Sequence, residues 1–248
     1  MPAVKVKYNM VKSSKAVKLP AYVKEIYGKI YENEKLCRYL DDERIVSFMT
    51  FGMQNRMVND VVKEISTNSA VLQIGCTFGK QIEAVAEKIG AYGKYVIVDV
   101  CPQQLERCRS KAIYQKIDFR SFDGSHQIGE KFDTVICYML LHELPPVTKA
   151  KVINAALDSV DEGGKVIFVD YHQPSKWNLW RFILKPFNRL YQPFAESMWK
   201  YSIESYAKNK EFFSWRKKTY AGRMYQKTVA VRQVPSYVKP PVKSSFYE

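Results

Sequence analysis

The fold class is decided by Val71-Leu72-Gln73-Ile74-Gly75-Cys76-Thr77-Phe78-Gly79. This apolar run ends in Gly-x-x-x-Gly, and it is followed by a helical apolar pattern and by a second apolar run that ends at Asp99. That order is typical of a βαβ nucleotide-binding unit. A glycine such as Gly75 lets the backbone approach a ligand, and an acid that ends the second strand can accept hydrogen bonds from both ribose hydroxyls. The pattern therefore predicts a site for a cofactor that carries adenosine.

The turn after the first run excludes two kinds of phosphate site. A dinucleotide fold needs Gly-x-Gly-x-x-Gly, but Cys76, Thr77 and Phe78 occupy that place. A phosphate-binding loop needs a following Gly-Lys-Ser/Thr, which the sequence lacks. S-adenosylmethionine (SAM) has a ribose and no phosphate, so it fits this turn better. A tight strand-helix turn in an unrelated α/β fold is the alternative that the turn alone leaves open.

Further apolar runs extend the unit into a sheet. The sequence predicts, in chain order, a third strand ending near Asp118-Phe119, a strand over 132–138, a helix over 149–160, a turn at Gly163-Gly164, and strands over 165–170 and 224–231. Apolar runs of this kind suit a parallel sheet that is covered on both faces. We therefore predict an α/β fold, a doubly wound, Rossmann-like sheet of about seven strands that binds ligands outside the carboxyl ends of its strands.

Length and composition are those of one domain. The chain has 248 residues, of which 46% are apolar, enough for a full core. We predict a basic flexible arm over 1–24, a single domain over 25–232 and a flexible tail over 233–248. Five cysteines without a Cys-x-x-Cys pair favour a reducing, cytoplasmic compartment over a disulfide framework or a zinc site. No apolar run approaches the roughly 20 residues that span a bilayer.

The charge and an insertion point to an anionic partner. The formal net charge is +14, and we predict a helical insertion over 172–215, before the final hairpin. Its predicted apolar stripe consists of Trp180, Leu184, Phe187, Tyr191, Phe194 and Met198. Its predicted basic row consists of Arg181, Lys185 and Arg189. Such a helix suits a membrane interface, where rings lie among headgroups and cations meet anionic lipid. A cap whose stripe packs on the sheet is the alternative, and the two are compatible.

The predicted cofactor contacts are Gly75, Cys76, Gly79, Asp99, Val100, Asp118 and Phe119. Gly75 and Gly79 would shape the turn around the methionine part of SAM, and Asp99 would accept from the ribose hydroxyls. Asp118 could take the adenine amino group, with Phe119 against the adenine ring. A plain strand-end cap is the alternative role for Asp99.

Several motifs together resemble the rhodoquinone-biosynthesis methyltransferase-like family, within the class I SAM-dependent methyltransferases. The resemblance runs from about residue 19 to 232 and rests on Leu19-Pro20-Ala21-Tyr22, Val98-Asp99-Val100-Cys101-Pro102, Leu140-Leu141-His142-Glu143-Leu144-Pro145, Val169-Asp170-Tyr171-His172-Gln173-Pro174 and Tyr225-Gln226-Lys227. It implies conversion of ubiquinone to rhodoquinone, in which an amino group from SAM replaces a ring methoxy group with the help of manganese (Mn2+). It also implies a peripheral position on an inner membrane, on the matrix side in a mitochondrion.

Two segments depart from the family pattern, Thr77-Phe78 in the cofactor loop and Tyr27-Gly28-Lys29-Ile30-Tyr31 near the amino end. Ordinary methyl transfer to a quinone or another small lipophilic substrate therefore stays open. A nucleic-acid substrate is not expected, because no Asn/Asp-Pro-Pro-Tyr/Phe follows the fourth strand to hold a flipped base.

Catalysis by amino transfer would need a base to take a proton from the donor's ammonium group. His142 and His172 both lie just past predicted carboxyl ends of central strands, where this fold places its chemistry. Tyr138, Glu143 and Asp170 share this rim, where they could orient a histidine or, with His142 and Glu143 as candidates, hold a metal. Polar caps of strand ends are the alternative role for both histidines.

Overall fold

A computed structural model describes residues 19–31, 33–111, 116–180, 182 and 192–234. Its strands are β1 (Ala70–Ile74), β2 (Lys94–Asp99), β3 (Ile117–Ser121), β4 (Phe132–Tyr138), β5 (Val160–Tyr171), β6 (Phe213–Tyr220) and β7 (Tyr225–Arg232). They form one seven-stranded sheet in the order β3-β2-β1-β4-β5-β7-β6. The first five strands are parallel, and β7 runs antiparallel to both β5 and β6. The predicted doubly wound α/β sheet is confirmed.

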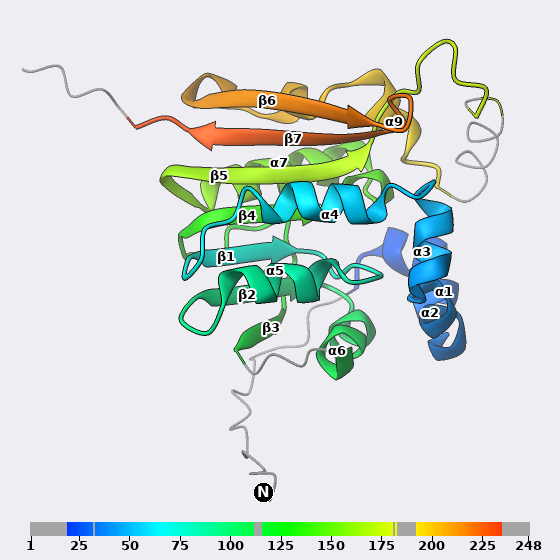
Figure 1. The fold of residues 1–248 in the computed structure, drawn as a ribbon, viewed down its shortest axis with the longest axis horizontal. Helices are drawn as coiled ribbons and strands as arrows, with labels where there is room; N and C mark the ends of the chain where they lie inside the picture. Colours follow the sequence, from blue (N-terminus) through cyan, green and yellow to red (C-terminus); the bar gives the residue numbers. More distant parts are fainter. Residues whose placement is uncertain (1–18, 32, 112–115, 181, 183–191, 235–248) are drawn as a thin grey trace, which may run out of the picture.

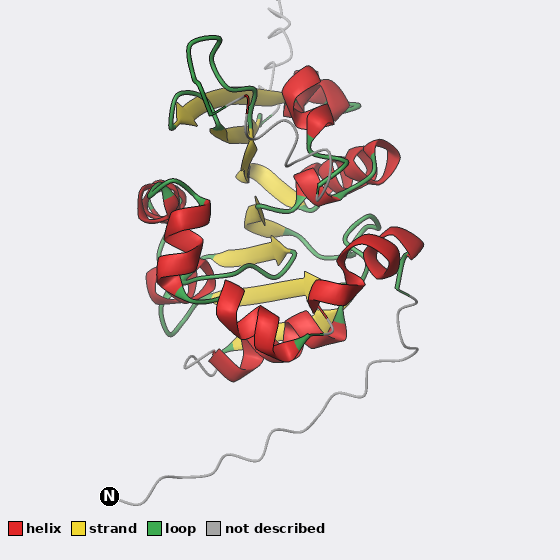
Figure 2. Ribbon diagram, turned by 90° about the vertical axis from the view of Figure 1, so that its right-hand side faces the viewer, coloured by secondary structure: helices red, strands yellow, loops and turns green. Residues whose placement is uncertain are grey.

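Helices cover both faces of this sheet (Figures 1 and 2). In chain order the helical elements are η1 (Val23–Tyr27), α1 (Gly28–Tyr31), α2 (Glu34–Leu40), α3 (Glu43–Met49), α4 (Gln54–Val62), α5 (Gln81–Ile89), α6 (Pro102–Lys111), η2 (Leu141–Glu143), α7 (Pro146–Asp158), α9 (Glu196–Lys200), η3 (Ile203–Tyr206) and η4 (Lys210–Phe212). One apolar core packs α4 and α5 on the sheet, and a second core packs α7, α9 and η3 on the other face. None of the described helices is both long and apolar enough to cross a bilayer.

The helical period of residues 82–89 places one side of α5 on the sheet. Ile82, Val85 and Ile89 are all buried, as the apolar spacing predicts. Gly75, after β1, and Gly90, after α5, both have a positive φ, of 89° and 77°. The βαβ unit therefore brings the loop after β1 and the end of β2 to the carboxyl edge of the sheet. Helices α1 to α3 lie at this same edge (Figure 1).

Two predicted strand and helix boundaries are wrong. β3 ends at Ser121, so Asp118 and Phe119 lie within the strand and not at its end. Helix α7 begins at Pro146, whose fixed φ suits a first helical turn, and ends at Asp158.

The predicted turn at Gly163-Gly164 lies within β5. Pairing with β4 shifts register between Phe132 and Thr134, and the residues between Val160 and Lys165 bulge from the ladder. Gly163, with a φ of 74°, lies in this irregular stretch. A glycine pair therefore marks a bulge here rather than a chain reversal.

The folded part of the chain also begins earlier than residue 25. Tyr22 and Val23, within the predicted arm, line the main cavity described below.

Only the two ends of the predicted insertion lie within the described residues. The predicted stripe residues Leu184, Phe187 and Tyr191 and the basic row lie outside them. At the far end Met198 is buried, and the Lys149 ammonium of α7 donates to the Phe194 carbonyl at 3.3 Å. The described end of the insertion therefore packs as a cap on α7.

Gly79 in the β1–α5 turn offers a test of this local geometry. Its φ is 79°, and a Cβ at this position would overlap the buried Gln54 amide. Gly52 has a similar φ of 71° but open space around it. We expect Gly52→Ala to cost about 1 kcal/mol of unfolding free energy, and Gly79→Ala to cost roughly 1–3 kcal/mol more, because overpacking adds to the backbone cost. Urea unfolding measures both, and equal losses would show that Gln54 moves aside freely.

Candidate active site

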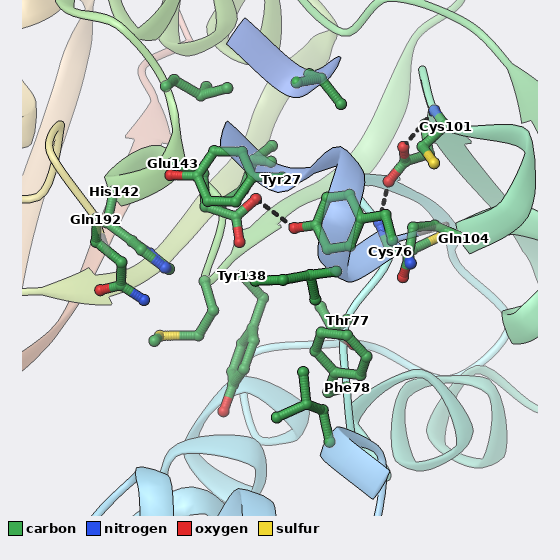
Figure 3. Close-up of a pocket in the computed structure, with 18 of the residues that line it drawn as sticks. Tyr27, Cys76, Thr77, Phe78, Cys101, Gln104, Tyr138, His142, Glu143 and Gln192 are labelled. Carbon is green, nitrogen blue, oxygen red and sulfur yellow. Dashed lines mark hydrogen bonds between the residues drawn. The ribbon is translucent and has the colours of Figure 1, made fainter. Parts of the chain in front are cut away.

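A cavity of about 430 Å³ opens at the carboxyl edge of the sheet (Figure 3). Its floor consists of Cys76, Thr77 and Phe78 after β1, of residues 99–101 at the end of β2, and of residues 138–140 and 142–144 at the end of β4. Side chains of the amino-terminal helices, between Tyr22 and Gln54, form the opposite wall, which we call the roof. The sequence did not predict that these side chains lie at the site. Among the described residues, six with phenyl or phenol rings line it: Tyr22, Tyr27, Tyr31, Phe78, Tyr138 and Tyr171.

Asp99 ties two of the floor segments together. One carboxylate oxygen accepts the Cys76 N–H at 2.7 Å, and the other accepts the Cys101 N–H at 2.8 Å. Each oxygen keeps a further lone pair, and Asp99 itself lines the cavity. Asp99 therefore acts as a strand-end cap, and its remaining lone pairs can accept from ribose hydroxyls.

Asp41, after α2, holds the roof on the cofactor loop. Its carboxylate accepts the Gly79 N–H at 2.8 Å and pairs with Arg107 at 2.9 Å and with Lys111 at 2.8 Å. The Arg107 guanidinium also lies 4.3 Å from the centre of the Phe78 ring. The loop after β1, α6 and the amino-terminal helices therefore share one charged junction.

We expect Asp41→Asn to lower the unfolding free energy by about 3 kcal/mol, because it leaves the largely buried Arg107 guanidinium without its carboxylate partner. SAM affinity should fall with it, because the loop after β1 loses its support. Urea unfolding and calorimetry measure the two effects. Glu34→Gln is the matched control: its pair with Arg38 is exposed, so it should cost less than about 1 kcal/mol. Similar losses in both variants would contradict the role of the junction.

His142 is the titratable base of the cavity. It lies in η2, and its Nδ1 is 3.0 Å from an Asp170 carboxylate oxygen. Asp170 is fully buried and also accepts the N–H groups of Leu141 and Tyr171, each at 2.7 Å. Burial opposes the charged imidazole, but the charge and hydrogen bond of Asp170 outweigh it and raise the pKa of His142. With Nδ1 engaged, Nε2 is the nitrogen left to exchange a proton.

A tyrosine of the roof reaches the same side of the cavity. The Tyr31 hydroxyl donates to Glu143 at 2.6 Å. Burial raises the pKa of the Glu143 carboxyl, although the His142 charge and the Tyr31 hydrogen bond oppose this rise. The Tyr27 ring stacks on Tyr31 at 5.8 Å, and its buried hydroxyl has no hydrogen-bond partner among the described residues. The roof thus offers polar groups to a ligand beside His142.

Some predicted cofactor residues lie at the cavity and others do not. Cys76, Asp99 and Val100 line it, and Gly75 and Gly79, each with a positive φ, flank the floor residues after β1. The two predicted adenine contacts do not line it. Asp118 is bound by Arg120 at 2.7 Å, and Phe119 lies under the Arg109 guanidinium.

Asp123 lies just beyond the carboxyl end of β3, but it does not line the cavity either. Its charge helps raise the pKa of the cavity residue Tyr22, after the larger effect of burial. The signal that could have found it is the dipeptide Asp123-Gly124, a turn pattern directly after the strand.

The predicted catalytic residues also separate into two groups. His142, Glu143 and Tyr138 line the cavity, although the Tyr138 hydroxyl points away from His142 in Figure 3. Asp170 lies behind His142 and orients it. His172 does not line the cavity, because its Nδ1 lies 3.0 Å and 3.1 Å from the carbonyls of Gln173 and Arg223. Of the two predicted histidines, His142 lies at the cavity and His172 lies outside it.

The residues present do not form a metal centre. No group of three or more His, Cys, Asp or Glu side chains in the described part of the chain could hold a metal ion. The two metal candidates are otherwise engaged, His142 with Asp170 and Glu143 with Tyr31. The described residues therefore do not fit the predicted manganese.

The charge of the cavity differs from that of the whole chain. Among the described residues that line it there is no lysine or arginine, while Asp99 and Glu143 bring two carboxyl groups. An anionic substrate would therefore meet repulsion, whereas the sulfonium of SAM would meet attraction.

Comparisons with known proteins agree with this geometry. A family model described as Methyltransferase domain matches residues 71–164, and no curated protein matches the sequence. Among solved structures, N-methyltransferase NodS from Bradyrhizobium japonicum WM9 with S-adenosyl-L-homocysteine is 13% identical over 83% of this chain and 95% of that chain, with a TM-score of 0.54. An O-methyltransferase family protein from Burkholderia thailandensis is 15% identical over 84% of this chain and 67% of that chain, with a TM-score of 0.59. Human N-acetylserotonin methyltransferase with SAM is 14% identical over 87% of this chain and 61% of that chain, with a TM-score of 0.56.

These structures share the fold, and the family match covers its first four strands, including the loop after β1 and Asp99. The chain is a SAM-dependent transferase of the class I methyltransferase fold.

Proposed function

We propose that this protein is an enzyme of quinone metabolism that converts ubiquinone to rhodoquinone, using SAM as the amino donor. The observation that carries the proposal is the cavity beside the cofactor loop. It is lined by tyrosines and aliphatic side chains, and no lysine or arginine is found among its described residues. A flat, neutral, oxygenated ring fits such a lining, because its faces can stack on aromatic rings and its oxygens can accept from phenol hydroxyls. The resemblance in sequence selects a quinone from this class.

The His142–Asp170 pair supplies the base that the reaction needs. When bound, SAM would supply the amino group of its methionine part, next to the loop after β1. His142 Nε2 can take a proton from an ammonium or a hydroxyl held beside it, and Asp170 stabilises the resulting imidazolium. The charge and hydrogen bond of Asp170 raise the pKa of His142 against the effect of burial, which makes the imidazole a stronger base. We assign no role to manganese.

Ordinary methyl transfer is the second candidate, and the same pair favours it. A histidine base held by a carboxylate can also deprotonate a ring hydroxyl, so that its oxygen attacks a methyl group. The O-methyltransferase neighbour shows that the fold is compatible with such chemistry. A nucleic-acid substrate has less support, because the two carboxyl groups of the cavity would repel phosphates.

Labelled SAM separates the two candidates. The purified protein is incubated with ubiquinone and with SAM that carries heavy nitrogen in its amino group, with and without added manganese. The mass of the quinone product is then measured by mass spectrometry. We expect the ring to lose a methoxy group and to gain the heavy nitrogen. A product that gains one methyl group instead would establish methyl transfer and contradict the proposal.

A further inference from the structure

Exposed apolar side chains gather at the carboxyl edge of the sheet. Phe48 and Met49 of α3 are 83% and 48% exposed, and Trp177, Leu179 and Trp180, after β5, are 93%, 77% and 49% exposed. We call these five residues the aromatic face. Figure 1 shows α3 and the loop after β5 at the same end of the molecule. Large exposed apolar groups that cluster in this way mark an interaction surface.

The two parts of the aromatic face are held together. The Phe51 ring, just after α3, packs edge-on against Trp180 with ring centres 5.0 Å apart. The Asn178 amide donates to the carbonyls of Ala221 and Gly222 at 3.2 and 3.3 Å, and Ser175 N–H donates to the latter at 3.0 Å. The backbone of the loop is therefore fixed to the β6–β7 turn, while the Trp177 and Leu179 side chains point outward.

The aromatic face adjoins the cavity. Met49 belongs to both, since it lines the cavity and is half exposed. Its neighbours Val46 and Thr50 also line the cavity. A molecule that enters from this side therefore passes over the aromatic face on its way to His142.

The charges beside the face are mainly positive. Arg44 on α3, Lys176 in the loop and Arg223 in the β6–β7 turn are exposed, and the whole chain carries +14. The acids at the start of α3 are already engaged, because Asp42 caps the helix at Arg44 N–H and Glu43 pairs with Lys80. Exposed rings among cations are what an anionic lipid surface binds.

We infer that the aromatic face docks on an anionic lipid bilayer and turns the mouth of the cavity toward the lipid. The identity of the entering molecule rests on the proposed function: an isoprenoid tail would stay in the bilayer while the quinone ring reaches His142. The docking itself involves α3, which lies outside the insertion that the sequence marked for membrane contact.

Vesicle flotation tests the docking. The full chain is floated with phosphatidylcholine vesicles with and without phosphatidylglycerol, and we expect binding that requires the anionic lipid. The triple variant Phe48→Ser/Trp177→Ser/Leu179→Ser should bind at least about tenfold more weakly, because each of these side chains contributes apolar burial. Tyr92→Ser is the matched control, since Tyr92 is 86% exposed between α5 and β2, at the opposite edge of the sheet. It should float like the unchanged protein.

Calorimetry with SAM and turnover of a tailless quinone analogue separate this inference from the proposed function. The triple variant should keep its SAM affinity and its turnover of the tailless quinone, because none of its three positions lines the cavity. If the unchanged protein ignores anionic vesicles, or if the triple variant floats equally well, the docking is wrong even where quinone turnover stands. Salt-dependent displacement of the vesicles by RNA would assign the surface to nucleic acid and also overturn it. Lipid binding that depends on the face, without quinone turnover, supports the docking and removes the proposed substrate.

Discussion

Asp99→Ala should weaken SAM binding by about 100-fold or more, equivalent to roughly 2.7 kcal/mol. Two backbone N–H groups would lose a charged acceptor, and each such bond is worth about 1.5–3 kcal/mol. Both groups belong to cavity-lining residues, Cys76 and Cys101, so the change also releases two walls of the cofactor site. Isothermal calorimetry with SAM and with its demethylated product measures the loss.

The matched control for this variant is Asp118→Asn. Asp118 is a carboxylate on the neighbouring strand, it is bound by Arg120, and it does not line the cavity. Its replacement should leave the SAM affinity within about twofold, a change of less than roughly 0.5 kcal/mol. Circular dichroism establishes that both variants fold. Unchanged affinity in Asp99→Ala would remove the assignment of this cavity to SAM, and a large loss in Asp118→Asn would restore Asp118 as an adenine contact.

The βαβ unit could be predicted because its signals are local. The apolar runs of β1 and β2, the spacing of Ile82, Val85 and Ile89, and the acid at the end of β2 lie within about thirty residues of one another. β3 lacks such signals: it is a short edge strand with no fully buried residue, so its end could not be placed from periodicity. The predicted end, near Asp118-Phe119, falls two residues short of the observed end at Ser121, so the expected adenine contacts Asp118 and Phe119 lie within the strand.

The roof of the cavity could not be predicted, because its contacts are distant in sequence. Tyr31 and Glu143 are 112 residues apart, and Gly79 and Asp41 are 38 apart. The tyrosine-rich segment 22–31 reads alone as a short amphipathic stretch next to a basic arm. Only the folded chain shows that it closes over the loop after β1 and supplies the aromatic lining on which the proposed substrate depends.

His142→Gln should lower kcat by about 100-fold or more, because general base catalysis contributes roughly 10²–10⁴-fold. SAM affinity should change little, since the cofactor contacts lie at Asp99 and the loop after β1. His172→Gln is the matched control: the same substitution outside the cavity should leave kcat unchanged. Full activity in His142→Gln would show that another group takes the proton.

The pH dependence distinguishes a base from a merely structural histidine. Neutral His142 is the active form, so kcat/KM should rise with pH through the pKa of His142, which Asp170 holds above the usual value of about 6.5. Asp170→Asn removes the larger of the two carboxylate charges that raise this pKa, the smaller being that of Glu143, and leaves burial, which lowers it. The acidic limb of the profile should therefore move to lower pH, while kcat falls because Asn can hold the wrong tautomer of His142. A limb at the same pH in Asp170→Asn would show that the titrating group is not His142.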